Sequence, residues 1–252
     1  MKLAILLAAA VIAQQACCDE PERIVGGDTA TIGQFRYQVS LQSYGEHICG
    51  GSIISSTHIL TAAHCVDDEF YTDDMVVVSG IDNLLAAGGD RHDIKCIRKH
   101  PNYTGERDGG WKDDIAVITL KKPIKINWAQ GPIPLTSKNH VNGDKRGIVS
   151  GWGKTKISGS SSPILKWLSV NVLSQERCLS GHKNPRTNEN QICTLEKVGK
   201  GACQGDSGGP LVVDDELVGV VSWVLPCALG ISDVYTNVYK YLDFIKESQL
   251  LC

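Results

Sequence analysis

Short segments in which apolar and polar residues alternate recur along most of this chain. Alternation with a period of two is typical of a β-strand that buries one face. Clusters of Gly, Asn, Asp, Ser and Pro separate the segments, as turns separate antiparallel strands. The segments lie at 35–42, 75–79, 94–97, 116–120, 147–150, 165–173, 211–213 and 217–223. The pattern predicts an antiparallel all-β sandwich or barrel.

A helical pattern is convincing only near the end of the chain. Apolar residues fall there at i, i+3, i+4 and i+7, the spacing of one helix face. They are Val238, Tyr241, Leu242 and Ile245. Asn237 precedes them and can act as an N-cap, so we expect a helix at about 237–248. The proline-rich segment 121–137 predicts a connector between two halves of the chain.

The first residues have the pattern of an export signal. Lys2 precedes an unbroken apolar run at 3–13, which is too short to cross a bilayer. We expect a signal peptide at 1–16, with the exact cleavage point left open, and a secreted product; a signal anchor is the alternative. No later run of the sequence is apolar enough to span a membrane, so we expect no membrane attachment.

The composition agrees with export and excludes other classes. The 252 residues are 42% hydrophobic, enough for one large domain or two small ones with a proper core. A net charge of −3 excludes a strongly basic nucleic-acid binder. Ten cysteines are many for a cytosolic enzyme and indicate disulfides formed in an oxidising compartment.

Three segments carry side chains that can perform chemistry together. His64 lies in the motif TAAHC at 61–65, which follows an apolar segment. Asp114 directly precedes a predicted apolar strand. Ser207 lies among the glycines of GDSGGP at 205–210, which leave the backbone free to turn sharply and point its N–H groups inward. Each residue alone has an ordinary structural explanation. Together they supply a nucleophile, a base and a group that orients the base.

Residues 24–248 resemble the chymotrypsin-like (trypsin-fold) serine endopeptidases. The motifs that carry the resemblance occur in the family's order: IVGG at 24–27, TAAHC at 61–65, DIAV at 114–117, GWG at 151–153, GDSGGP at 205–210 and VSW at 221–223. The resemblance implies an all-β fold of two antiparallel six-stranded Greek-key β-barrels with a C-terminal helix. We therefore expect barrels at about 24–130 and 131–236, with the active site between them.

The resemblance also implies the roles of the reacting groups. His64 would take the proton of Ser207 and later protonate the leaving amine, and Asp114 would orient His64. The backbone N–H groups of Gly205 and Ser207 would form the oxyanion hole. Asp113 is an adjacent rival, but the apolar Ile-Ala-Val follows Asp114 directly. We expect no cofactor and no metal site.

Family members of this kind are made as zymogens, and the sequence matches that arrangement. Cleavage after Arg23 by a trypsin-like activating protease would remove a propeptide at 17–23 and leave a protease domain at 24–252. The new ammonium of Ile24 would pair with Asp206 and order the pocket, because a buried carboxylate without a partner is costly. We expect a monomer whose partners are protein or peptide substrates and protein inhibitors.

The resemblance implies most of the disulfides. The family pattern gives Cys49–Cys65, Cys178–Cys193 and Cys203–Cys227. We add Cys96–Cys252, which departs from the common pattern, because the C-terminal helix packs back on the first barrel in this family. The pairing of Cys17 and Cys18 stays open.

The pocket residues leave the substrate preference open. By resemblance the pocket is lined by Gly201, Ala202, Ser222, Trp223, Val224 and Asp233. Trypsin-like members carry Asp at the position of Gly201, so we expect no simple trypsin. The pattern looks like insect chymotrypsins and favours cleavage after apolar residues. Val224 would narrow the entrance, as in elastases, and Asp233 could add tolerance for basic residues.

Other polar residues carry less information. The remaining histidines have no metal-ligand spacing, and we interpret them as ordinary surface residues: His47, His58, His92, His100, His140 and His182. The triplet 102–104, Asn-Tyr-Thr, is an N-glycosylation acceptor pattern in a predicted loop. A catalytically silent homologue remains the alternative to an active enzyme, and the retained Ser, His and Asp argue against it.

Overall fold

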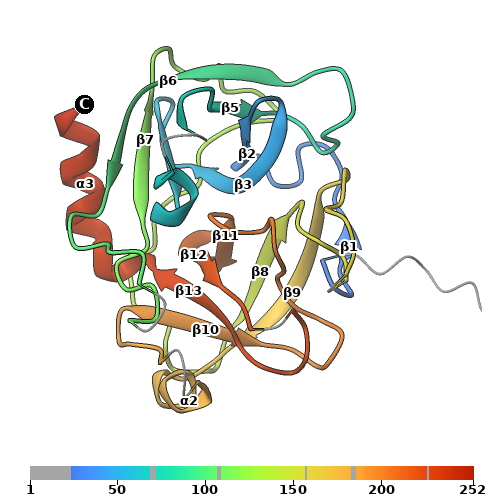
Figure 1. The fold of residues 1–252 in the computed structure, drawn as a ribbon, viewed down its shortest axis with the longest axis vertical. Helices are drawn as coiled ribbons and strands as arrows, with labels where there is room; N and C mark the ends of the chain where they lie inside the picture. The colour runs from blue at the N-terminus through green and yellow to red at the C-terminus, as the bar shows by residue number, and fades with distance from the viewer. Residues whose placement is uncertain (1–23, 69–71, 107–108, 157, 183–185, 226) are drawn as a thin grey trace, which may run out of the picture.

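A computed structural model describes residues 24–68, 72–106, 109–156, 158–182, 186–225 and 227–252 (Figure 1). Its strands form two closed barrels stacked one above the other in the view of Figure 1. All strand pairs within the barrels are antiparallel. The expected fold of two six-stranded antiparallel barrels with a C-terminal helix is confirmed.

The first barrel closes in the order β2-β3-β4-β7-β6-β5. Its strands are β2 (Gln38–Ser43), β3 (Glu46–Ile53), β4 (His58–Thr61), β5 (Val76–Ser79), β6 (Asp90–Lys99) and β7 (Ala116–Leu120). Pairing of β2 with both β3 and β5 completes the circle and leaves no open edge.

The second barrel repeats this strand order. Its strands are β8 (Arg146–Gly151), β9 (Lys166–Val172), β10 (Gln191–Leu195), β11 (Pro210–Val213), β12 (Glu216–Trp223) and β13 (Asp233–Asn237). It closes in the order β8-β9-β10-β13-β12-β11, because β8 pairs with both β9 and β11. A short strand near the start of the described residues, β1 (Asp28–Thr29), adds to β9.

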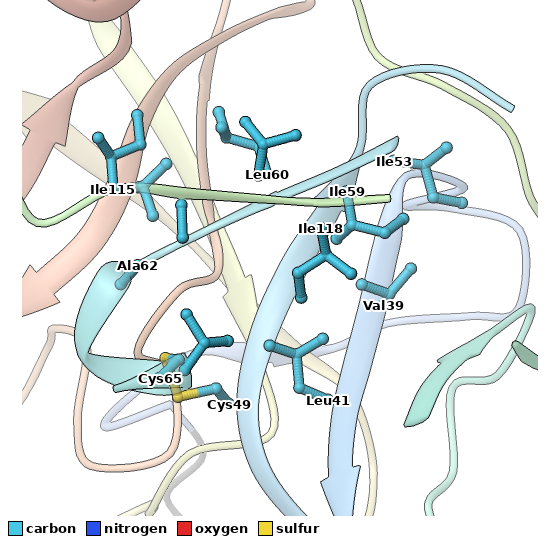
Figure 2. Close-up of a cluster of buried hydrophobic side chains, with 14 of the residues drawn as sticks. Val39, Leu41, Cys49, Ile53, Ile59, Leu60, Ala62, Cys65, Ile115 and Ile118 are labelled. Atoms are coloured by element: carbon cyan, nitrogen blue, oxygen red, sulfur yellow. A yellow bond between two sulfur atoms is a disulfide. The ribbon is translucent and has the colours of Figure 1, made fainter. Parts of the chain in front are cut away.

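β-Branched and leucine side chains fill the first barrel (Figure 2). Val39 and Leu41 point inward from β2, and Ile59 of β4 lies directly opposite Ile118 of β7; all four are fully buried. Such cross-strand pairs stabilise a sheet through close side-chain packing. The Cys49–Cys65 disulfide lies at one end of this core (Figure 2).

The C-terminal helix packs on the first barrel, beside β7 (Figure 1). A 3₁₀ turn, η2 (Val238–Tyr241), comes first, and α3 (Leu242–Leu251) follows. Val238, Tyr241 and Ile245 are buried in the first-barrel core, as their spacing predicts. The expected cap is wrong: Asn237 makes no side-chain cap, and its Nδ2 instead donates to Oδ1 of Asn139 at 2.9 Å.

Helical structure also occurs earlier in the chain, contrary to our expectation. The 3₁₀ turn η1 (Ala63–Val66) carries His64, and the helix α2 (Gln175–Gly181) precedes β10. Ser174 caps α2 by accepting a hydrogen bond from the N–H of Arg177. Neither segment is long enough to produce a helical periodicity in the sequence. In the described part of the chain, no helix has the length and apolar character needed to cross a membrane.

Four disulfides join segments of the described structure: Cys49–Cys65, Cys96–Cys252, Cys178–Cys193 and Cys203–Cys227. The first holds the turn that carries His64 against β3. The second fastens the end of α3 to β6, and these two cysteines are 156 residues apart in the sequence.

We expect the double variant Cys96→Ser/Cys252→Ser to fold but to unfold at a lower urea concentration. A cross-link over a long loop restricts the unfolded chain and stabilises the folded state by about 2–4 kcal/mol. Urea unfolding of the full chain measures this as a lower midpoint, with a steeper slope because the unfolded chain without the cross-link exposes more surface. An unchanged midpoint would mean that helix packing alone holds the C-terminus.

Candidate active site

The carboxylate of Asp114 is fully buried and fixed from several sides. Its Oδ2 lies 2.8 Å from Nδ1 of His64 and accepts a hydrogen bond from Oγ of Ser222 at 2.6 Å. Its Oδ1 accepts from the backbone N–H of His64 at 2.9 Å, and its carbonyl accepts from Thr236. Because a carboxylate only accepts, Nδ1 of His64 must carry the proton, which leaves Nε2 free to accept one.

The charged form of His64 is stabilised in this position. Burial alone lowers the pKa of His64, but the negative charge of Asp114, its hydrogen bond and the more distant Asp67 raise it. The net pKa lies above the usual histidine value. The imidazole is therefore suited to take up a proton during a reaction, and 27% of its side chain faces solvent.

Asp113, the adjacent carboxylate, points elsewhere. Its Oδ1 accepts a hydrogen bond at 2.7 Å from the hydroxyl of Tyr241, at the start of the C-terminal helix. Of the two carboxylates, Asp114 is therefore the one that contacts His64.

Ser207 lies in a tight turn that precedes β11, half-buried between the barrels. Its carbonyl accepts from the N–H of Gly50 on β3, and the N–H of Gly208 bonds to Val221 on β12. A Cβ on Gly208 would collide with Thr61 and lie 3.1 Å from Sγ of Cys65, beside His64. The turn therefore needs glycine to approach the His64 segment this closely.

Asp206, next to Ser207, is fully buried and held by backbone amides. Its Oδ1 accepts from Gly153 at 2.8 Å and its Oδ2 from Cys203 at 2.9 Å. A Cβ at Gly151 or Gly153 would collide with this carboxylate, which explains both glycines of the GWG motif. Burial raises the pKa of Asp206 to about 6, against the lowering effect of the two amides.

Ile24 is also fully buried, and Arg23 precedes it in the sequence. Its nitrogen is then an uncharged amide. Among the described contacts, the Asp206 carboxyl therefore has backbone amides for partners and no positive charge.

Asp233 is buried beside Gly201, the residue that we expect at the base of the specificity pocket. Its Oδ2 accepts from the N–H of Ala202 at 2.8 Å, and a Cβ on Gly201 would lie 2.8 Å from the same oxygen. The carboxyl thus stands beside the space that a side chain at 201 would fill. Burial raises the pKa of Asp233 to about 7; the Ala202 amide opposes this shift and the charge of Asp206 adds to it.

Three of the expected pocket residues, Ser222, Trp223 and Val224, lie at the end of β12 and directly after it. Trp223 is buried, donates from Nε1 to the carbonyl of Gly110 at 3.2 Å and packs against Trp111 with ring centres 5.7 Å apart. Val224 is half-buried and packs against the apolar clusters of the second barrel. Ser222 has an unexpected contact, because its hydroxyl bonds to Asp114.

Two histidines that we expected on the surface belong to this region. Nε2 of His47 lies 2.9 Å from the carbonyl of Gly205, and its Nδ1 lies 2.8 Å from Oγ of Ser40. Burial lowers the pKa of His47, so its neutral form is favoured. His182 is buried, bonds to Ser232 and packs edge-on against Trp223 at 4.7 Å. No sequence motif marks either contact, since Gly205 is 158 residues from His47.

Comparison with known proteins places the chain in a family. Residues 24–245 match the family model described as Trypsin. Chymotrypsin-2 of Vespa crabro is 35% identical over 227 residues, which cover 90% of this chain and all of that protein. Trypsin of Sus scrofa is 37% identical over 235 residues, which cover 91% of this chain and 97% of that protein. Trypsin I-P1 of Gallus gallus is 38% identical, with 91% and 90% covered.

These matches extend over nearly the whole of the described structure. The chain belongs to the trypsin family and is a serine endopeptidase with the chymotrypsin-like fold.

Proposed function

We propose that this endopeptidase is a secreted, monomeric zymogen that is activated by cleavage after Arg23. The active enzyme then hydrolyses peptide bonds through an acyl-enzyme on Ser207, mainly after apolar residues. The observation that carries the catalytic part is the pair of contacts that Asp114 makes with His64, from Nδ1 and from the backbone N–H. An apolar N-terminal run and the disulfides support export.

The first chemical step transfers a proton from Ser207 to Nε2 of His64 as the serine oxygen attacks the substrate carbonyl. Asp114 stabilises the imidazolium that forms. His64 then returns the proton to the leaving amine, and water repeats the sequence to release the acyl group. Trypsin-type enzymes share this sequence of steps, and the buried Asp114 supports it here.

The oxyanion of each tetrahedral intermediate would be held by the N–H groups of Gly205 and Ser207. Gly205 has a φ of +97°, a backbone conformation that strongly favours glycine. His47 bonds to the carbonyl of Gly205 and so holds that residue in one orientation.

Activation depends on the position of Asp206. Cleavage after Arg23 creates an ammonium at Ile24, which is already buried in the second barrel. Pairing with this charge offsets the desolvation that raises the pKa of Asp206. Because Asp206 adjoins Ser207, the pair would stabilise the turn that forms the oxyanion hole. A separate trypsin-like protease is the expected activator, since Gly201 gives this chain no trypsin-type pocket base.

The specificity rests on the pocket floor and on Val224. With Asp233 protonated, the floor beside Gly201 carries no charge and suits apolar side chains, as in a chymotrypsin-like enzyme. Ionised Asp233 can instead pair with a basic side chain. Val224 would favour smaller residues, so elastase-like or mixed preference is the second candidate.

A peptide library varied only at the residue before the scissile bond tests this proposal. The enzyme is the zymogen cut after Arg23, with Ser207→Ala as the inactive control. Preference for Phe, Tyr or Leu would support the proposal. Preference for Ala or Val would make the enzyme elastase-like, and dominant cleavage after Arg or Lys would overturn the apolar assignment. No cleavage by a chain that begins at Ile24 would support a silent, partner-binding homologue.

We expect the preference to depend on pH through Asp233. The ratio of kcat/KM for a Lys peptide to that for the matched Leu peptide should rise severalfold between about pH 6 and pH 8, as Asp233 ionises. Titration of His64 changes kcat/KM for both peptides by the same factor, so it does not change the ratio. In Asp233→Asn the ratio should be low and flat. A flat ratio in the unmodified enzyme would remove Asp233 from substrate recognition.

A further inference from the structure

The loop between β6 and β7 carries an acceptor triplet that catalysis does not use. Asn102, Tyr103 and Thr104 form an Asn-X-Thr sequence, and the chain contains no other Asn-X-Ser/Thr triplet. Such a triplet is modified only if the asparagine lies at the surface of a protein that enters the secretory compartment.

The local backbone presents Asn102 outward. His100 to Tyr103 form a turn closed by a hydrogen bond of 3.0 Å from the N–H of Tyr103 to the carbonyl of His100. Pro101 stands at the second position of this turn, where its fixed φ is favoured. Asn102 and Thr104 are both exposed, and the described contacts leave the side chains of both without a hydrogen bond.

The flanking residues hold this turn in place. The ring of His100 packs edge-on against Tyr241 and Phe244 of the C-terminal segment, at 5.3 and 4.8 Å. The half-buried side chain of Tyr103 packs against the first-barrel core, within electrostatic reach of Asp114. Asn102 is thus a solvent-facing position between two anchored side chains.

We propose that Asn102 carries an N-linked glycan, which shields this loop from the protease that activates the zymogen. The proposal rests on the proposed secretion and activation. The donor is a lipid-pyrophosphate-linked oligosaccharide of the secretory compartment. The bond from its anomeric carbon to the phosphate oxygen breaks, and a bond from that carbon to Nδ2 of Asn102 forms. Nδ2 loses a proton, and the lipid pyrophosphate leaves.

A glycan on Asn102 could protect the chain from unwanted cleavage, because basic residues follow Asn102 closely in the sequence. A trypsin-like activator must cut after Arg23, but Arg107 and Lys112 come shortly after Asn102. Lys112 is exposed, and exposed loop residues are preferred sites of proteolytic nicking. A cut in this segment would separate the strand β6 from Asp114. A bulky glycan at the start of the loop would direct the activator to Arg23.

Secretory expression of the full chain in eukaryotic cells tests the modification. Peptide:N-glycosidase should increase the gel mobility of the unmodified sequence and convert Asn102 to aspartate in its peptide. Thr104→Ser keeps the acceptor pattern and should behave identically, whereas Thr104→Val and Asn102→Gln should show no mobility change. A secreted chain with unmodified Asn102 would overturn the glycan alone. A chain that stays in the cell without a glycan would overturn the proposed secretion as well.

Limited digestion with trypsin tests the shielding. In a Ser207→Ala background, the glycosylated chain and Thr104→Ser should be cut after Arg23 while the loop stays intact. Thr104→Val should be cut severalfold faster after Arg107 or Lys112, with the rate at Arg23 unchanged. Equal loop cleavage in Thr104→Ser and Thr104→Val would overturn the protective role.

Discussion

Asp114→Asn should remove nearly all activity and leave the fold intact. An amide NH₂ at this position would donate to Nδ1 of His64, which forces the proton onto Nε2 and prevents uptake of the Ser207 proton. Trypsin-type enzymes with this substitution lose about 10⁴-fold in kcat, and we expect a loss of that order. Steady-state kinetics on the best library peptide, with unfolding curves for stability, measures both effects.

The pH profile should change in the same variant. Peptide hydrolysis needs neutral His64, so kcat/KM rises as pH increases through the raised pKa of His64. Without the Asp114 charge that pKa falls, and the acid limb of the residual activity should move to lower pH.

Asp113→Asn is the matched control for the neighbouring carboxylate. The Asn oxygen can still accept the hydrogen bond of Tyr241, and Asp113 makes no contact with His64. Its kcat should stay within a few-fold of the unmodified enzyme. A loss as large as that of Asp114→Asn would contradict the assignment of Asp114.

Asp206→Asn should hold the cleaved enzyme in its inactive state. The amide fits the same space and can accept from Gly153, but it offers no charge to the Ile24 ammonium. Without this pair the Gly205 turn loses its support, and loss of one oxyanion donor costs about 2.7–4 kcal/mol, or about 10²–10³ in kcat. Kinetics after confirmed cleavage at Arg23 measures the effect. Full activity would contradict the activation mechanism.

The same residue should make the uncut chain less stable as pH rises. Folding raises the pKa of Asp206 from 3.8 to about 6, so the folded state binds more protons than the unfolded state between these values. The free energy of unfolding therefore falls as pH increases through this range. Asp233, with a pKa of about 7, acts in the same direction up to a higher pH. We would compare the urea unfolding of Ser207→Ala with that of Ser207→Ala/Asp206→Asn across this pH range. The free energy of unfolding should depend less steeply on pH in the double variant, because it lacks the Asp206 carboxyl.

Strands in which apolar and polar residues alternate could be predicted from the sequence. Strands without this alternation could not, for physical reasons. The segments 116–120 and 217–223 became β7 and β12 because their apolar residues face a core. Strand β3 contains Gly50 and Gly51, which pack closely against the Ser207 turn and β2 and so give no apolar pattern. The two barrels share one strand order, but their two segments of sequence show no visible repeat. Backbone pairing between strands tolerates different side chains, so the same strand order does not require similar sequences.

The candidate site divides in the same way. His64, Asp114 and Ser207 were found because short motifs surround each of them. The contacts from Ser222 and Thr236 to Asp114, and from His47 to Gly205, join residues more than a hundred positions apart. Only the closed barrels bring these residues together, so no local pattern could reveal them.

Covalent labelling with a fluorophosphonate would show directly whether Ser207 is an activated nucleophile. We predict rapid labelling of Ser207, located by peptide mass spectrometry, once Ile24 is the confirmed N-terminus. The uncut chain, and the cleaved Asp206→Asn variant, should react far more slowly. Absence of labelling in the cleaved, folded enzyme would contradict the proposed mechanism, because a buried Asp114 and an oriented His64 would then not activate the serine.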